Sequence, residues 1–325
     1  MNEYTSIFAG HILGLINQKQ SIGYSYLSET AILKRFDTFC NTNYPTVQTL
    51  DKDIILHWSR QRMGEHPSTL QGRVTPVREL AKYIIANGQQ AFILPKGMLP
   101  KIPRYLPYIY SDDEITRIFS YIDQCHYHIE VPYRHLVMPV FFRLLYCCGL
   151  RVTEARLITV GDVDLHEGVV TLINTKLGKH RQIPLPHKLH EKLIDFHKVV
   201  HLYSNSDDWF FPGYKNKPMS IGNIEKNHRK FLWQAGVSHH GRTKPGERGA
   251  PCIHSYRHTF AVHCLRNWIR EGKDIQAYMP VLQAYMGHTS YSDTAYYLHL
   301  TADVFPDITY RLEQELGDII PIITI

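Results

Sequence analysis

The stretch GHTSYSDTAYYLHL, residues 287–300, decides how the rest of this chain is interpreted. It places a histidine in a turn, Gly287-His288, and follows it with a short polar segment and the tyrosine pair Tyr296-Tyr297. Neighbouring residues on a helix point about 100° apart, so only one of the two tyrosines can face a given site. The stretch therefore brings one histidine and one reactive phenol to the same part of the chain.

Two earlier stretches supply the positive charge that a phenol needs to attack a phosphate. The first, CCGLRVTEARL, has Arg151 at a tight turn before a helix. The second, HSYRHTF, has His254 and Arg257 three residues apart, which places them on one face of a helix. Between them Lys176 ends a predicted hairpin strand, from which it can swing into a site. The order of these residues predicts a single site built from distant segments.

These residue types together suit the breakage of a phosphodiester without a metal. Arginines neutralise the charge that builds on the phosphate oxygens, because the guanidinium is planar, permanently charged and bidentate. A tyrosine oxygen can attack in line, while a lysine or histidine protonates the leaving 5′ oxygen. Each residue alone is weak evidence, since a lysine near a hairpin turn usually serves solubility. The ordered set predicts DNA strand cleavage by a tyrosine nucleophile.

The composition is that of a water-soluble globular protein with a mild bias towards polyanions. The chain has 325 residues, 44% hydrophobic and 20% charged, with a net charge of +6. This length favours two domains. The six cysteines form no CxxC pair and indicate a reducing compartment. Because the sequence shows neither a signal peptide nor a membrane-spanning run, we expect a cytoplasmic protein that contacts no membrane.

The twenty histidines raise the alternative of a metal site. The sequence contains no HExxH and no Cys/His set at zinc spacing, and the nearest candidates are the pairs His239-His240 and His254/His258. We therefore expect neither a metal nor another cofactor.

Residues 1–93 are expected to form an N-terminal helical, DNA-binding domain. Apolar residues recur at helical spacing, Asp51 and Ser68 are candidate helix caps, and Asn87-Gly88 closes the last helix. Its basic side chains either line a DNA backbone or form a solvated helix face, and the sequence leaves both open. They are Lys34, Arg35, Arg60, Arg62, Arg73, Arg78 and Lys82.

A proline-rich segment, residues 94–107, is predicted to be an extended linker between two domains. It carries Lys101 and Arg104, which are candidate DNA contacts. A second candidate lies in the glycine-rich loop HHGRTKPGERGAP, through Arg242 and Lys244. Both assignments rest on charge and position alone.

Residues 108–304 are expected to form the catalytic domain, mainly helical with a small antiparallel sheet, an α+β arrangement. Ser111 begins a helix, a buried helix ends at Gly149, and residues 168–175 pair with residues 181–185 in the one convincing hairpin. Further helices are predicted over 187–203, 220–234 and 253–270. An amphipathic helix and an apolar tail, residues 305–325, follow.

Taken in order, these motifs resemble the tyrosine recombinases of the phage-integrase family. The matching segments are GLRVTEA, TKLGKHRQIPL, HSYRHTFAVH and YMGHTSYSDTAYY, and the N-terminal helices resemble that family's SAM-like core-binding domain. The resemblance implies a catalytic set of Arg151, Lys176, His254, Arg257, His288 and the nucleophile Tyr297. Tyr297 stands nine residues after His288, and this spacing favours it over Tyr296. Glu154 matches an acidic position that supports the first arginine.

The resemblance also implies a 3′-phosphotyrosyl intermediate, no metal or ATP, a clamp on double-stranded DNA and a homo-tetramer on two paired recombination sites. An accessory recombination protein is left open as a further partner, and the resemblance implies action at the bacterial nucleoid. The pattern PVLQAYMGH with DTAYYL is similar to integrases and transposases of mobile elements. We expect the tail to dock on a neighbouring protomer, with packing in cis as the alternative.

The sequence departs from the family pattern at two places. Tyr256 stands where the family usually has leucine, and residues 278–280 lengthen the approach to the Gly-His turn.

Two alternative functions stay open. They are a DNA-binding protein that no longer cleaves and an enzyme similar to a type IB topoisomerase. The filled catalytic positions argue against the former.

Overall fold

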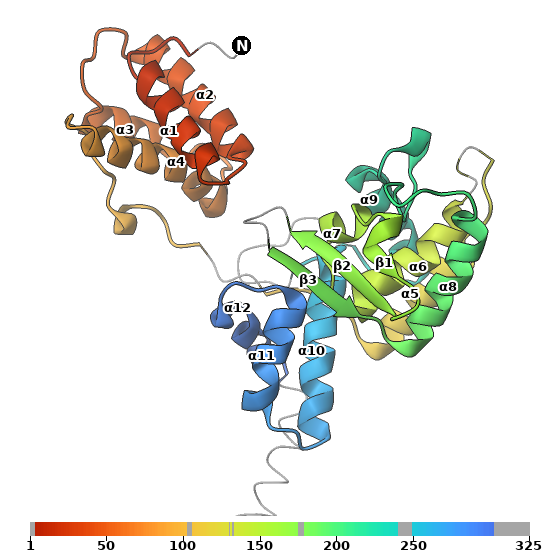
Figure 1. Cartoon of the computed structure of the whole chain (residues 1–325). Coiled ribbons are helices and arrows are strands. Elements are labelled where there is room, and N and C mark those ends of the chain that lie inside the picture. Colours follow the sequence, from red (N-terminus) through yellow and green to blue (C-terminus); the bar gives the residue numbers. More distant parts are fainter. Residues whose placement is uncertain are drawn as a thin grey trace, which may run out of the picture. The chain divides into compact units, whose positions relative to one another are not determined.

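The computed structural model describes residues 4–102, 106–129, 131, 133–174, 179–239 and 249–301. The chain divides into two compact units, Met1–Arg104 and Tyr105–Ile325. Figure 1 labels their helices and strands. As predicted, the fold is mainly helical with a small antiparallel sheet. Among the described residues, none of the helices has the length and apolar character needed to span a membrane.

The first unit is built from helices around one apolar core. They are α1 (Ala9–Ser21), α2 (Leu27–Asn43), α3 (Lys52–Trp58), α4 (Pro67–Ala86) and the short 3-10 helix η1 (Lys96–Met98). Asp51 caps α3 as predicted, because its side chain accepts a hydrogen bond from the Ile54 backbone nitrogen. The predicted cap at Ser68 is wrong. Helix α4 begins at Pro67, and the His66 ring accepts the bond from the Ser68 backbone nitrogen.

The second unit carries the sheet and the remaining helices. In chain order they are α5 (Asp112–Asp123), α6 (Arg134–Cys147), α7 (Val152–Arg156), η2 (Val160–Asp162), β1 (Val163–Asp164), β2 (Val169–Asn174), β3 (Lys179–Pro184), α8 (His187–Val200), η3 (Tyr214–Asn216), α9 (Ile221–Gln234), α10 (His254–Arg270), α11 (Ile275–Met286), α12 (Tyr291–Ala295) and η4 (Tyr296–Leu300). Ser111 forms a full capping box with Glu114 at the start of α5, as its sequence predicts.

The sheet has the strand order β1-β2-β3, and both pairings are antiparallel. Val170 faces Ile183 and Leu172 faces Arg181 in the register of β2 with β3. The two-residue strand β1 was not predicted, because two residues are too few to show a period. Residues 175–178, between β2 and β3, include Lys176 and lie outside the described residues.

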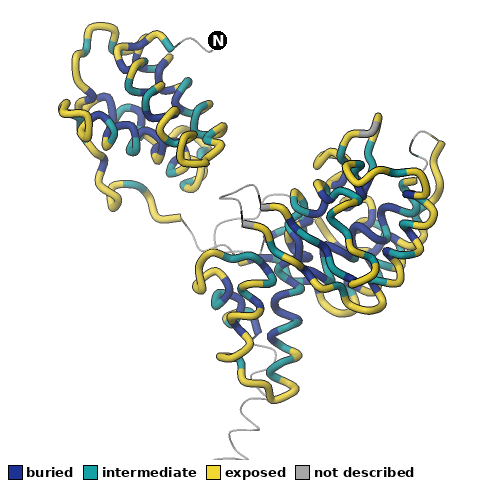
Figure 2. The backbone as a smooth tube through the Cα atoms, viewed as in Figure 1, coloured by how far each residue is buried: buried dark blue, intermediate teal, exposed yellow. Residues whose placement is uncertain are grey.

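Helix α6 is the centre of the main core. Phe141 and Phe142 are fully buried, and α6 packs against α5, α8 and α10. Figure 2 colours buried parts of the backbone dark blue. Gly149 ends this segment with a φ of +58°, a left-handed conformation that favours glycine. The predicted stop of the buried helix is therefore confirmed, and it leads directly into the turn that carries Arg151.

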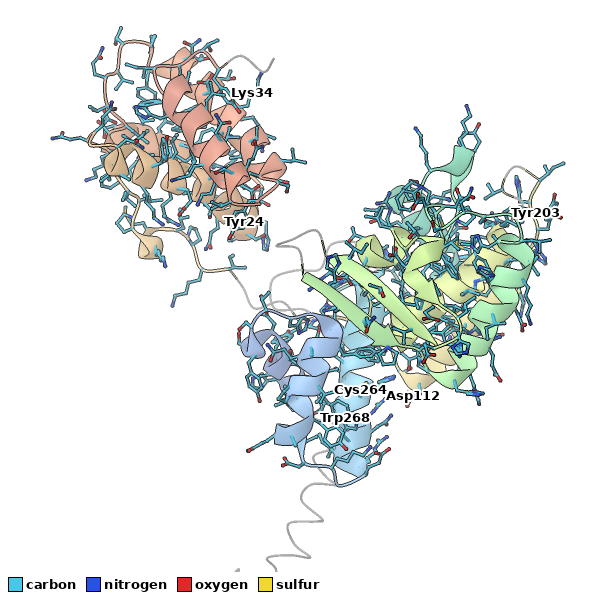
Figure 3. All side chains as sticks on the ribbon, viewed as in Figure 1. Tyr24, Lys34, Asp112, Tyr203, Cys264 and Trp268 are labelled. Atoms are coloured by element: carbon cyan, nitrogen blue, oxygen red, sulfur yellow. The ribbon has the colours of Figure 1, made fainter. Side chains whose placement is uncertain are left out.

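A smaller apolar cluster joins α10, α11 and η4. Its buried members include Leu265, Met279, Met286 and Tyr297. An ion pair links the start of α5 to α10, with 3.2 Å between Arg266 Nη2 and Asp112 Oδ1, and Figure 3 labels Asp112 close to this helix. The apolar cluster, by contrast, holds the end of the segment GHTSYSDTAYYLHL, residues 295–300, against α10.

Candidate active site

The ends of four helices bring together the predicted catalytic residues that the structure describes. Arg151 precedes α7, while His254 and Arg257 lie in the first turns of α10. His288 follows α11, and Tyr297 lies in η4. Lys176 lies outside the described residues, so its predicted place beside them stays a prediction.

Arg257 is the most deeply buried member of the site. Its side chain is 1% exposed. Nη1 donates to the Gly149 carbonyl at 2.6 Å, and Nη2 donates to the Met286 carbonyl at 2.7 Å. Burial and the nearby charge of Arg151 lower the pKa of Arg257 to about 10, so it remains cationic at neutral pH. Among the described residues it forms no ion pair with a carboxylate, which leaves its charge available to an anion.

Arg151 is held in place by Glu154. Its Nη1 donates to Glu154 Oε1 at 2.7 Å, and its backbone nitrogen donates to Oε2 at 2.9 Å. A weaker contact of 3.5 Å joins Arg151 Nη2 to the Gly287 carbonyl, next to His288. Burial raises the pKa of Glu154, but hydrogen bonds from Arg181 and Arg151 outweigh it and the net shift is downward. Glu154 is therefore a carboxylate that supports Arg151, in the place the sequence suggested.

Arg181 of β3 is a site residue that the sequence interpretation missed. It donates to both oxygens of Glu154, at 3.1 and 2.9 Å, and to the Tyr285 carbonyl at 3.2 Å. A signal was available, since Arg181 and Ile183 are two residues apart and therefore face the same side of the strand. A charged side chain on the core side of a strand indicates a buried partner.

Tyr297 is 3% exposed, and its hydroxyl lies 2.9 Å from Nδ1 of His258. Burial raises the pKa of Tyr297 to about 12, although the positive charges of Arg257 and Arg151 act in the opposite direction. Tyr296 is partly exposed, and its ring meets that of Tyr297 edge-on at 5.9 Å. The hydroxyl of Tyr297 therefore contacts a histidine of α10, His258.

The three histidines near Tyr297 are neutral at physiological pH. Nδ1 of His288 lies 2.8 Å from the buried Thr294 hydroxyl, and its ring stacks on Tyr297 with 6.2 Å between centroids. The ring of His254 meets that of His258 edge-on, 4.6 Å between centroids. Burial, followed by the charges of Arg257 and Arg151, lowers the pKa of both His254 and His288 to about 4.

The arrangement is a cationic site around a phenol. The guanidinium groups of Arg151, Arg181 and Arg257 converge, and Glu154 supplies one compensating carboxylate. The site begins at the N-terminal end of α10, where the helix dipole adds further positive potential. Such a site attracts an anion, and its fixed donors suit a phosphate rather than a metal ion. Among the described residues, no three His, Cys, Asp or Glu side chains cluster to hold a metal.

The predicted DNA contacts of the first unit divide into surface and structural residues. Arg35, Arg60, Arg62, Lys82 and Lys101 are exposed, while Lys34 and Arg78 are partly buried. Lys82 pairs with Glu79 at 2.6 Å, and Arg78 Nε donates to the Leu94 carbonyl at 2.9 Å. Arg104, Arg242 and Lys244 lie outside the described residues.

The prediction that Arg73 contacts DNA is corrected, because its side chain is buried and bonded within the first unit. It is 7% exposed, its Nε lies 2.7 Å from Glu65 Oε1, and it also donates to the backbone carbonyls of Trp58 and Arg60. An arginine whose donors are used internally cannot reach a phosphate without breaking these bonds. Tyr256, in contrast, is fully buried at the core position that the sequence suggested.

Comparison with known proteins agrees with this geometry. The model of the phage integrase family matches residues 110–303. The chain is 28% identical to a putative integrase/recombinase of Sinorhizobium fredii, y4rB, over 96% of this chain and 99% of that protein. It is 30% identical to the tyrosine recombinase XerA of Pyrococcus furiosus over 67% of each chain.

Two solved structures share the fold. The XerH site-specific recombinase bound to palindromic difH substrate in a post-cleavage complex has a TM-score of 0.66 at 16% identity, covering 98% of this chain and 90% of that one. The Tn1549 transposon integrase in complex with circular intermediate DNA has a TM-score of 0.60 at 16% identity, covering 88% and 94%. The chain belongs to the phage integrase family and is a tyrosine-type site-specific recombinase.

Proposed function

We propose that this chain cuts and rejoins duplex DNA at a specific site through a covalent 3′-phosphotyrosyl bond to Tyr297, without a metal or ATP. The observation that carries the proposal is the position of the Tyr297 hydroxyl against His258, in the field of Arg257 and Arg151. A phenol with a raised pKa becomes a nucleophile only where cations stabilise the charge that develops, and this site supplies them.

The reaction has two balanced steps. In cleavage, the Tyr297 oxygen forms a bond to the scissile phosphorus and releases its proton to the solvent, while the bond to the 5′ oxygen breaks and that oxygen gains a proton. Arg151 and Arg257 bind the non-bridging oxygens, and Lys176 is the proposed donor of the proton to the leaving oxygen. Rejoining reverses these steps with a 5′-hydroxyl from a second DNA strand, so the phosphotyrosine conserves the bond energy.

The partners follow from the same proposal. The first unit is a core-binding domain that completes a clamp on a double-stranded recombination site, and four protomers assemble on two paired sites. The likeness to y4rB of S. fredii and to the Tn1549 integrase supports an integrase or transposase of a mobile element. Residues 305–325 dock on a neighbouring protomer. Deletion of this tail tests the last point, since a full-sized complex on DNA would contradict it.

The chemistry is tested with nicked suicide substrates. Duplexes selected from a random library for binding to the protein define the two half-sites, and probes are then nicked at each successive position between them. Wild type, Tyr297→Phe and Tyr296→Phe are incubated with each probe in EDTA, and covalent adducts are separated on a denaturing gel. An adduct lost only in Tyr297→Phe is the expected result. The absence of any adduct on a bound probe would favour a DNA-binding protein that does not cleave.

A further inference from the structure

His258 lies at the centre of the site but has no place in the catalytic set taken from the family resemblance. It is one helical turn after His254 on α10 and adjacent to Arg257, so all three residues share one face. Its Nδ1 lies 2.9 Å from the Tyr297 hydroxyl, a normal hydrogen-bond length, and the two ring centroids are 5.7 Å apart. Among the described residues, His258 is the side chain that forms a hydrogen bond with this hydroxyl.

The surroundings decide which of the two groups donates. Burial, followed by His254 and the positive charge of Arg257, lowers the pKa of His258 to about 3, so its ring is neutral. The phenol keeps its proton at neutral pH because its own pKa is raised. A phenol is a stronger donor than a neutral imidazole, and the tautomer with the proton on Nε2 leaves a lone pair on Nδ1. The hydroxyl therefore donates to His258.

This direction has a geometric consequence for the nucleophile. When the Tyr297 O–H points at Nδ1, the lone pairs of the oxygen point away from His258 and can face a phosphorus atom. The stacked ring of His288 restricts the phenol from another side, and Thr294 holds His288 in turn. The tyrosine is thus fixed both by packing and by one directional bond.

We propose that His258 is a positioning residue for strand cleavage: its Nδ1 accepts the hydrogen bond of the Tyr297 hydroxyl and so turns the attacking lone pair of that oxygen towards the phosphate. The inference rests on the proposed function, because it assigns a role in the same reaction. Misplacement of a nucleophile by about 1 Å can reduce a rate about 100-fold, so loss of this bond has a measurable effect.

Two substitutions separate the hydrogen bond from simple packing. In His258→Asn the amide oxygen can accept from a position close to that of Nδ1, whereas His258→Leu fills similar space without an acceptor. His187→Leu, at an exposed site on α8 with 85% of its side chain accessible, is the matched control. The measured quantity is the single-turnover rate of adduct formation on the nicked probe at saturating protein. Circular dichroism and the Kd for the intact duplex establish that each variant folds and binds.

We expect His258→Leu to reduce the cleavage rate about 100-fold at unchanged Kd, and His258→Asn to recover at least about tenfold of that loss. A probe with sulfur in place of the bridging 5′ oxygen has a leaving group that needs no proton. Since the defect lies on the side of the nucleophile, this probe should not rescue His258→Leu, although it should rescue a variant that lacks the general acid.

The outcomes separate this inference from the function on which it rests. A wild-type protein that forms no adduct would refute the proposed function. A wild-type adduct with an unchanged rate in folded His258→Leu would overturn the positioning role alone. Equal loss in the leucine and asparagine variants would also overturn it, and so would rescue of His258→Leu by the sulfur probe.

Discussion

The carboxylate of Glu154 accepts a hydrogen bond from each terminal nitrogen of Arg181, at 3.1 and 2.9 Å. Glu154 also holds Arg151, so one carboxylate connects strand β3 to the turn before α7. Arg181 further donates to the Tyr285 carbonyl near the end of α11. The hairpin that carries the predicted general acid is therefore fastened to the segments that carry Arg151 and His288.

Replacement of Arg181 by lysine should weaken cleavage more than DNA binding. Lysine keeps the charge but cannot bind both carboxylate oxygens, so Arg151 loses part of its support. A hydrogen bond to a charged group contributes about 1.5–3 kcal/mol. If this energy is lost from the transition state, the cleavage rate should be about 10- to 100-fold lower. Single-turnover cleavage and a binding isotherm on the same duplex measure the two effects. A rate equal to that of wild type would show that the pairing has no bearing on the chemistry.

Gly287→Ala should damage the same region for a steric reason. Gly287 has a φ of +66°, and an added Cβ would lie 2.7 Å from Nη1 of Arg181. The substitution therefore strains the backbone and displaces the guanidinium. We expect lower thermal stability together with slower cleavage. Gly10→Ala, where an added Cβ meets nothing within 4 Å, is the control and should leave the cleavage rate unchanged. Wild-type activity in Gly287→Ala would contradict the steric argument.

The buried His228 should make stability sensitive to acid. Burial lowers its pKa from 6.5 to about 3, and its Nε2 lies 3.1 Å from the Tyr110 hydroxyl. Because the unfolded chain takes up the proton first, the free energy of unfolding should fall as the pH drops below about 6.5 towards 3. Between pH 6.5 and pH 5 this single group predicts a loss of about 2 kcal/mol.

Denaturant unfolding at several pH values tests this dependence. Glutamine places an amide near the position of Nε2 and does not titrate, so His228→Gln should show a flatter profile over the same range. Parallel profiles for wild type and variant would mean that His228 is not the responsible group.

Arg73 and Arg35 offer a test of structural against surface arginines in the first unit. Arg73→Leu removes one partner of a buried ion pair with Glu65 and should destabilise the protein by about 3–5 kcal/mol. Arg35 is exposed, and Arg35→Leu should change stability by less than about 0.5 kcal/mol. Chemical denaturation compares them. Similar unfolding free energies in the two variants would refute the structural place of Arg73.

Local sequence signals predicted much of the fold because they act over a few residues. Asp51 and Ser111 cap their helices as expected, and the buried run before Gly149 ends where a left-handed residue is required. The prediction that Ser68 caps a helix was wrong for an equally local reason. The ring of His66 took the hydrogen bond that a serine hydroxyl was expected to accept, and histidine is not a usual cap.

The site could be predicted only in part. Their order along the chain predicted a common site for Arg151, His254, Arg257, His288 and Tyr297, and the structure brings these residues together. Arg181 and His258 were not predicted, because what places them in the site is contacts across the fold. Arg181 reaches Glu154, 27 residues earlier, and His258 meets Tyr297, 39 residues later. A sequence pattern carries no record of which strand or helix end will be adjacent to a given side chain.

Arg257 donates hydrogen bonds to two backbone carbonyls, and these bonds give it a structural function in addition to the proposed catalytic one. Gly149 and Met286 belong to segments far apart in the chain, and the guanidinium that we propose to bind a phosphate also joins them. A related protein that no longer cleaves DNA would still need this arginine to hold the two segments together. The presence of Arg257 in a related chain is therefore poor evidence of activity, whereas the proposed function requires Tyr297 for cleavage.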